Sequence, residues 1–185
     1  MFLFPLVLGF LFNLLSAFTT FFCRVLGEPR GRATTFILRN VLGIPVWTVG
    51  LALAVRARSA RLFAPSPVTE LVGWLLLASG CTLILLALFA LRSRAALPST
   101  SDPLVTDGPY AYVRHPIHSG MLLTLLALVL LRPSRASLLA AIIAVAWVLL
   151  QSRLEEFDLL QRLPAYRAYM QRIPRFVPRL RRRAT

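Results

Sequence analysis

A polar loop that leads into an apolar segment carries the first residues whose types and spacing could support chemistry. The loop runs from Arg92 to Arg114, and its end together with the helix start that follows spans Leu104–Gly120. Pro116 suits the first turn of a helix, which would leave unpaired backbone N–H groups and a positive dipole end beside it. Because Arg114, His115 and His118 surround that helix start, the pattern predicts a site for an anionic group such as a carboxylate.

Two tyrosines in the same loop, Tyr110 and Tyr112, provide aromatic faces on which a flat ring could stack. Each of these residue types also occurs at an ordinary membrane interface, where tyrosine lies at headgroup level and arginine binds lipid phosphate. The combination of residues at one helix start, rather than any one of them, indicates a site.

A second polar cluster comprises Arg153, Glu155, Glu156 and Asp158. The cluster would also suit a solvated helix face with local ion pairs. However, five of the seven acidic residues in the chain lie in these two stretches: Asp102, Asp107, Glu155, Glu156 and Asp158. This concentration predicts a partner for a cationic group of a ligand.

The elements that must position these residues are membrane helices. The 185 residues are 57% hydrophobic and 15% charged, with a mean hydropathy of +0.71. The apolar residues form long blocks, and a crossing needs roughly 20 of them, which leaves no room for a separate soluble domain. We therefore expect an all-α integral membrane protein with about five transmembrane helices, a C-terminal helical hairpin and short interfacial helices.

Five apolar segments are predicted to cross the membrane. They are about Phe2–Cys23, Phe36–Val55, Leu71–Leu91, Ile117–Leu131 and Leu138–Leu150. Gly73 and Gly80 are predicted helix-contact positions, and Arg39 is expected to extend toward the interface. The link of residues 132–135 predicts a tight hairpin between the last two segments.

The remaining organisation follows from the same blocks. Residues 1–95 are interpreted as three N-terminal spans, and residues 96–185 as the region that bears the site. Arg153–Arg172 has helical amphipathic spacing that Pro164 interrupts, which predicts two short helices along the surface.

Cys23 and Cys81 are expected to be buried, with no disulfide and no metal site. The first segment is read as a retained span and not a cleaved signal peptide.

The charge pattern gives an orientation. The net charge is +14, and all 21 basic residues are arginines in loops and the tail, which favours an anionic membrane surface over nucleic acid. With five crossings the more arginine-rich side includes the C-terminus, which is therefore predicted to be cytoplasmic. Four crossings would instead place the N-terminus inside. The all-arginine basic set and the high alanine and leucine content suggest a bacterial inner membrane.

The two polar clusters together resemble the isoprenylcysteine carboxyl methyltransferase and phospholipid methyltransferase superfamily. The pattern of that superfamily is Gly-Pro-Tyr followed by Arg-His-Pro-x-Tyr-x-Gly, then a glutamate pair, Tyr-x-x-Tyr and Val-Pro-Arg. The corresponding residues here are Gly108-Pro109-Tyr110, Arg114-His115-Pro116-Ile117-His118-Ser119-Gly120, Glu155-Glu156, Tyr166-x-x-Tyr169 and Ile173-Pro174-Arg175. The match covers roughly the last ninety residues, in order.

The resemblance implies a membrane-embedded methyltransferase that binds S-adenosylmethionine without a Rossmann domain. By that resemblance the cofactor pocket would be lined by Leu104, Val105, Tyr110, His115, Pro116, His118, Glu155 and Glu156. Arg153 would orient a substrate carboxylate and, with Glu155, carry the catalytic role. The implied partners are the membrane and a lipid-like substrate, with no nucleic acid and no metal.

Two departures and three alternatives accompany the resemblance. His118 replaces the tyrosine of the first block, and Leu163-Pro164 replaces and shortens the Phe-Gly before Tyr166. The alternatives are a phospholipid or amine N-methyltransferase, an NADPH-dependent membrane reductase, and a non-catalytic membrane factor of the same fold. The reductase is disfavoured because Met121 stands where such enzymes carry a glutamate. The methyl acceptor is not readable from the sequence.

Overall fold

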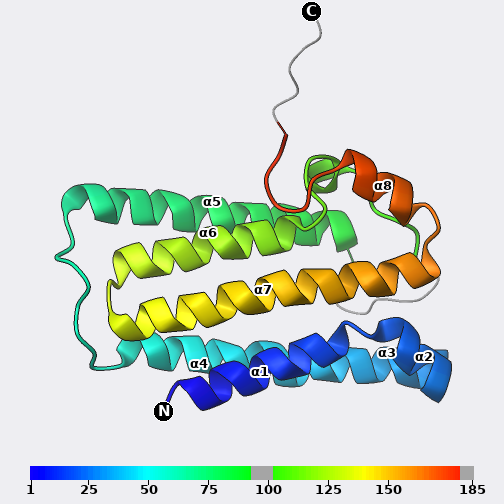
Figure 1. The fold of residues 1–185 in the computed structure, drawn as a ribbon, viewed down its shortest axis with the longest axis horizontal. Helices are drawn as coiled ribbons and strands as arrows, with labels where there is room; N and C mark the ends of the chain where they lie inside the picture. Colours follow the sequence, from blue (N-terminus) through cyan, green and yellow to red (C-terminus); the bar gives the residue numbers. More distant parts are fainter. Residues whose placement is uncertain (93–101, 180–185) are drawn as a thin grey trace, which may run out of the picture.

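The structure is a computed structural model that describes residues 1–92 and 102–179, and these residues are almost entirely helical (Figure 1). The elements are α1 (Leu3–Ser16), α2 (Thr19–Leu26), α3 (Glu28–Phe36), η1 (Ile37–Gly43), α4 (Ile44–Arg56), α5 (Pro67–Leu91), η3 (Gly108–Ala111), α6 (Pro116–Leu131), α7 (Arg135–Arg162) and α8 (Tyr166–Arg172). Within the described ranges no strand forms, and one isolated bridge joins Arg61 and Ser134. The predicted all-α membrane fold is confirmed.

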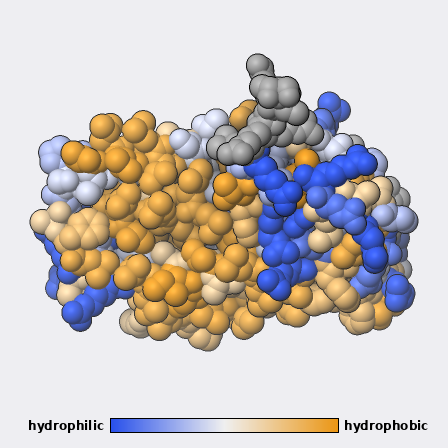
Figure 2. Space-filling view, turned by 45° about the horizontal axis from the view of Figure 1, so that its top comes forward, coloured by the Kyte–Doolittle hydropathy of each residue, from blue (hydrophilic) through white to orange (hydrophobic). Residues whose placement is uncertain are grey.

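The long helices lie side by side along one axis (Figure 1). Three helical segments in the described part are each long and apolar enough to cross a membrane: residues 28–56, α5 and α7. The bent pair α1–α2 would be a fourth if it forms one span, whereas α6 is apolar but has only 16 residues. Apolar residues cover the middle of the face in Figure 2, and hydrophilic residues gather most densely at the end that carries α8. The boundary predicted at residues 95/96 lies outside the described residues.

The first apolar segment is not one straight helix. The axes of α1 and α2 differ by 64°, and Phe18 between them has a non-helical ψ of 48°. Ser16 donates a side-chain hydrogen bond of 2.6 Å to the Asn13 carbonyl, a local bond that competes with the helix ladder and bends it. The start of α2 leaves backbone N–H groups without partners in the helix, and a distant element pairs one of them. The Thr20 N–H donates to an Asp158 carboxylate oxygen at 2.9 Å.

The second segment runs without interruption from α3 through η1 to α4, and its centre is a π-helix. Pro45 has no N–H to donate, and the turn before it widens so that the Ile44 N–H donates to the Arg39 carbonyl. That Arg39 extends toward the membrane interface stays a prediction. Arg39 lines an internal cavity, where polar neighbours are available to a charge in an apolar helix.

The helices α5 and α6 pack closely at two glycines of α5. A Cβ built at Gly80 would lie 2.6 Å from the Gly120 carbonyl oxygen, and one at Gly73 would lie 2.8 Å from the Leu131 side chain. Both predicted contact glycines are therefore confirmed. Cys81, on the same helix, is exposed and not buried as predicted, because it faces away from α6.

This packing makes a testable prediction about stability. Gly80→Val should lower the free energy of unfolding by about 1–3 kcal/mol, because the added methyl groups would push α5 away from α6. Ala78→Val, which places the same valine side chain at an exposed position of α5, is the matched control. Thermal unfolding in detergent, followed by circular dichroism, measures both. Equal melting temperatures for the two variants would contradict the close packing.

The helix α7 differs most from its prediction. It continues from the apolar segment to Arg162, so the stretch after Leu150 is not a separate surface helix. Its polar side faces inward: Gln151, Glu156 and Asp158 are buried, whereas Phe157 is 56% exposed. The apolar side of the amphipathic pattern faces outward because the surroundings of a membrane protein are themselves apolar. The break near Pro164 and the second short helix, α8, agree with the prediction.

Candidate active site

The two motif blocks meet through their backbones at the start of α6. The Arg114 N–H donates to the Pro174 carbonyl at 2.9 Å, and the His115 N–H donates to the Arg175 carbonyl at 3.1 Å. The Ser119 hydroxyl adds a bond of 2.7 Å to the Phe176 carbonyl. The segment after α8 is thus held against the loop that precedes α6, although about sixty residues separate them.

The local sequence explains how the loop delivers its side chains. Gly108, the first residue of the short helix η3, has a φ of +56°, a conformation that favours glycine, and Pro109 lies in the first turn of that helix. η3 places Tyr110 in the interior, where the Tyr169 hydroxyl donates to the Tyr110 carbonyl at 2.6 Å. The loop is therefore fixed to α8 as well as to the segment that follows it.

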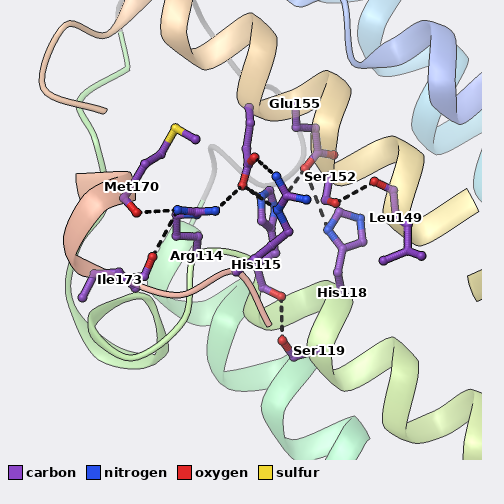
Figure 3. A network of polar contacts seen from close by, with 11 residues as sticks. Arg114, His115, His118, Ser119, Leu149, Ser152, Glu155, Met170 and Ile173 are labelled. Carbon is purple, nitrogen blue, oxygen red and sulfur yellow. Dashed lines mark hydrogen bonds and ion pairs between the residues drawn. The ribbon is translucent and has the colours of Figure 1, made fainter. Parts of the chain in front are cut away.

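Glu156 is the centre of a buried ion-pair network. Its carboxylate accepts from the Arg114 guanidinium at 3.0 Å, from His115 Nε2 at 3.1 Å and from Arg175 Nε at 3.0 Å, and Arg175 also donates to the second oxygen. Arg114 in turn donates to the carbonyls of Met170 and Ile173 (Figure 3). The anion predicted beside this helix start is therefore supplied, at least at Arg114, by the protein's own Glu156.

Glu155 occupies the neighbouring position and faces the two histidines. His115 Nδ1 lies 3.6 Å from Glu155 Oε2, and His118 Nδ1 lies 3.9 Å from the same oxygen. The Gln151 amide donates to the other oxygen, Oε1, at 2.9 Å. Figure 3 shows His115 and His118 projecting from the start of α6 toward α7, which bears Glu155.

The charges of this cluster change the titration of groups outside the spans. Burial opposes protonation of His115, but hydrogen bonds and charge interactions with Glu155 and Glu156 outweigh it and raise its pKa. Burial also raises the pKa of Tyr169 to about 12 and raises that of Tyr110 further. The tyrosines are therefore neutral hydrogen-bonding groups at physiological pH.

A cavity of about 350 Å³ opens between the N-terminal helices and α6–α7. Its lining includes six of the residues that the sequence assigned to the cofactor pocket: Leu104, Val105, Tyr110, His115, His118 and Glu155. Pro116 and Glu156 are buried behind this wall and do not line it. Arg153 is exposed and lies outside the cavity, so the structure does not bring it to the other predicted residues.

The sequence analysis missed several residues of this cavity. From α7 they include Trp147 and Gln151, and from the N-terminal half they include Arg39 and Trp47. Asp158, which the sequence placed in the second polar cluster, also lines the cavity. Trp147 and Gln151 precede Glu155 at helical spacing, since the three residues are each four positions apart and so share one face of α7. A charged residue inside an apolar segment was the available signal for Arg39.

The sequence pattern of the phospholipid methyltransferase family matches residues 68–165, which is more than half of the chain and includes α5, α6, α7 and the Arg114–His118 loop. The chain belongs to the phospholipid methyltransferase family. The matched region thus includes both parts of the site, the start of α6 with His115 and His118 and the part of α7 that bears Glu155 and Glu156.

A curated relative gives a more limited likeness. The cobalt-zinc-cadmium resistance protein CzcN of Cupriavidus metallidurans is 36% identical over 83 residues, which are 43% of this chain and 38% of the relative. The chain thus matches well under half of that protein's length. No solved structure matches the chain.

Proposed function

We propose that this family member is an S-adenosylmethionine-dependent methyltransferase of the membrane, and that its acceptor is a lipid-like molecule. The observation that carries the proposal is the cavity at the meeting point of the two motif blocks. Its volume, about 350 Å³, lies within the range of small-molecule sites, and aromatic, apolar and charged side chains line it together.

The buried polar atoms of the cavity support a polar ligand. Among the described residues, buried side-chain atoms without a hydrogen-bond partner include Gln151 Oε1, Trp147 Nε1 and Tyr166 Oη, and all three residues line the cavity. Burying such atoms without partners costs free energy, so their concentration here favours a ligand that pairs with them. The residues present fit this cofactor, which carries an aromatic base, hydroxyl groups and both charges.

When bound, the cofactor supplies an electrophilic methyl group on a positively charged sulfur. Glu155 would hold a cationic part of the ligand, and Tyr110 and Trp147 offer aromatic surfaces for its base. The buried walls would exclude water and hold the reacting groups in line, which are the main contributions that such a displacement needs from a protein. A carboxylate acceptor would need no base, whereas an amine would first have to lose a proton.

The apolar part of the lining supports a lipid-like acceptor. Ile44, Leu88 and Met121 contribute to the same cavity from α4, α5 and α6, and the outer faces of these helices are apolar. An acceptor with a hydrocarbon chain could then approach from the membrane while its polar end reaches the cluster. An isoprenylcysteine carboxylate is the acceptor that we propose first, and a phospholipid amine is the alternative within the family.

The orientation proposed from the sequence also has structural support. The helices α2 and α3 lie at the same end of the bundle as α8 (Figure 1). The elements at this end carry Arg24, Arg30, Arg32, Arg162, Arg167 and Arg172, whereas the segments at the opposite end carry Arg56, Arg58, Arg61, Arg132 and Arg135. The arginine bias of the sequence places the α8 end in the cytoplasm. We therefore propose a bacterial inner-membrane protein whose cofactor enters from the cytoplasmic side.

Equilibrium binding to detergent-purified protein tests the proposal. We expect S-adenosylmethionine to bind with micromolar affinity, NADPH not to bind, and His115→Ala to weaken cofactor binding at least tenfold, since His115 orients both glutamates. Glu70→Gln, at an exposed position of α5, is the control. Transfer of a labelled methyl group to extracted membrane lipids or a prenylcysteine then identifies the acceptor. Preference for NADPH, or no binding of either, would refute the proposal.

A further inference from the structure

Three potential metal ligands meet at the cavity wall. One nitrogen each from His115 and His118 and one oxygen from Glu155 all lie within 4.8 Å of one another. The two histidines are buried, and all three side chains line the cavity. They come from only two elements, the start of α6 and the continuous helix α7, so their relative positions are fixed by helix packing and not by a loose loop.

The spacing is close to that of a metal centre. Zinc binds nitrogen and carboxylate oxygen at about 2.0–2.2 Å, so neighbouring ligand atoms of a tetrahedral site lie roughly 3.3–3.5 Å apart. Here Glu155 Oε2 lies 3.6 Å from His115 Nδ1 and 3.9 Å from His118 Nδ1. A movement of a few tenths of an ångström would bring each histidine–glutamate pair to coordinating distance. All three ligand atoms lie within 4.8 Å of one another, so the two histidine rings would also have to move closer together, by up to about an ångström.

Two of these three side chains are also held by hydrogen bonds on the side that faces away from the other two, as metal-binding side chains usually are. His115 Nε2 faces the Glu156 carboxylate at 3.1 Å, which leaves Nδ1 directed at the cluster. The Gln151 amide donates to Glu155 Oε1, which leaves Oε2 directed at the histidines. Glu156 is itself held by Arg114 and Arg175, so the support behind His115 is rigid.

We propose that His115, His118 and Glu155 bind one divalent transition-metal ion of the zinc and cobalt class. Two imidazole nitrogens and one carboxylate oxygen are a donor set that suits these ions. The three ligands leave a fourth position open toward the cavity. This proposal reverses the expectation of no metal, which the resemblance to the methyltransferase superfamily implied.

A regulatory consequence follows, and it rests on the proposed function. The same three side chains line the pocket assigned to the cofactor, so metal and cofactor would exclude each other. Zinc would then inhibit methyl transfer by occupying the cofactor's polar contacts. Metal binding itself does not depend on the methyltransferase proposal, because it is measured without the cofactor.

The test titrates Co²⁺ into the full chain in detergent and follows the visible absorption of the bound ion. The chain has two histidines, so the protein must carry no polyhistidine tag. We expect one bound Co²⁺ per chain, displaced by Zn²⁺. His118→Tyr, which restores the residue of the superfamily pattern, and Glu155→Gln should each weaken binding at least tenfold, and Glu70→Gln should leave it unchanged.

The outcomes separate the metal site from the methyltransferase. Absence of bound-ion absorption in the wild type, or binding that neither His118→Tyr nor Glu155→Gln weakens, overturns the metal site. Circular dichroism of each variant verifies that it is folded, and either folded variant suffices. Cofactor binding is then measured with and without saturating Zn²⁺. At least tenfold weaker binding supports the shared site, and unchanged affinity overturns it. Failure of cofactor binding in metal-free protein would refute the proposed function alone.

Discussion

Replacing Glu156 with glutamine is expected to destabilise the protein by about 3–5 kcal/mol. The Glu156 carboxylate compensates Arg114, whose side chain is only 10% exposed, and it also binds His115 and Arg175. Removing one partner of a buried ion pair leaves an uncompensated buried charge, and that cost approaches the entire stability of many proteins. Glu156→Gln keeps the shape of the side chain, so the loss would come from the charge.

The same variant should release the segment after α8. Arg175 lies on that segment and is held to α7 through Glu156, while Arg114 holds the carbonyls of Met170 and Ile173. Thermal unfolding in detergent measures the stability, and limited trypsin digestion measures the release through faster cleavage after Arg172 and Arg175. Glu70→Gln is the matched control. An unchanged melting temperature together with unchanged cleavage would show that the network contributes little.

Replacing Glu155 with glutamine is expected to affect activity far more than stability. Glu155 is partly exposed. Its carboxylate lines the cavity next to His115 and His118, whereas that of Glu156 does not line it. A hydrogen bond to a charged group contributes about 1.5–3 kcal/mol, so losing one to a cationic ligand should lower kcat/KM by roughly 10- to 150-fold. Because the lost contact is with the cofactor, most of the effect should appear in the KM for S-adenosylmethionine.

The measurement is methyl transfer at varied cofactor concentration, with the acceptor held constant. The comparison of Glu155→Gln with Glu156→Gln is informative because the two residues are adjacent but differ in role. We expect the first to retain its melting temperature and lose cofactor affinity, and the second to lose stability. A decrease of less than threefold in kcat/KM for Glu155→Gln would argue against a direct contact with the ligand.

Much of this molecule can be predicted from its sequence because hydropathy and local backbone chemistry act over short distances. Long apolar blocks require helices in a membrane, since every backbone polar group must be paired within the segment. Gly73 and Gly80 were recognisable as contact positions because small residues allow helices to approach closely. The Arg114–His118 block and the glutamate pair indicated the site, and the structure brings them together.

Other features depended on contacts between distant segments. The sequence suggested a surface helix after Leu150 because the amphipathic pattern does not reveal which side faces the protein. Only the packed bundle shows that α7 continues and that its polar side is buried. The break in the first segment likewise leaves the Thr20 N–H without a partner in its own helix. Asp158, which lies 138 residues later in the chain, accepts its hydrogen bond.

The different positions of the two glutamates were also decided by the tertiary structure. Adjacent residues on a helix point about 100° apart, so Glu155 faces the cavity and Glu156 faces the arginines behind it. The sequence by itself determined the membrane-helical class, the motif residues and their general chemistry, because these follow from local composition and spacing. The tertiary structure decided which carboxylate meets which partner, because that depends on how α6, α7 and the segment after α8 pack against one another.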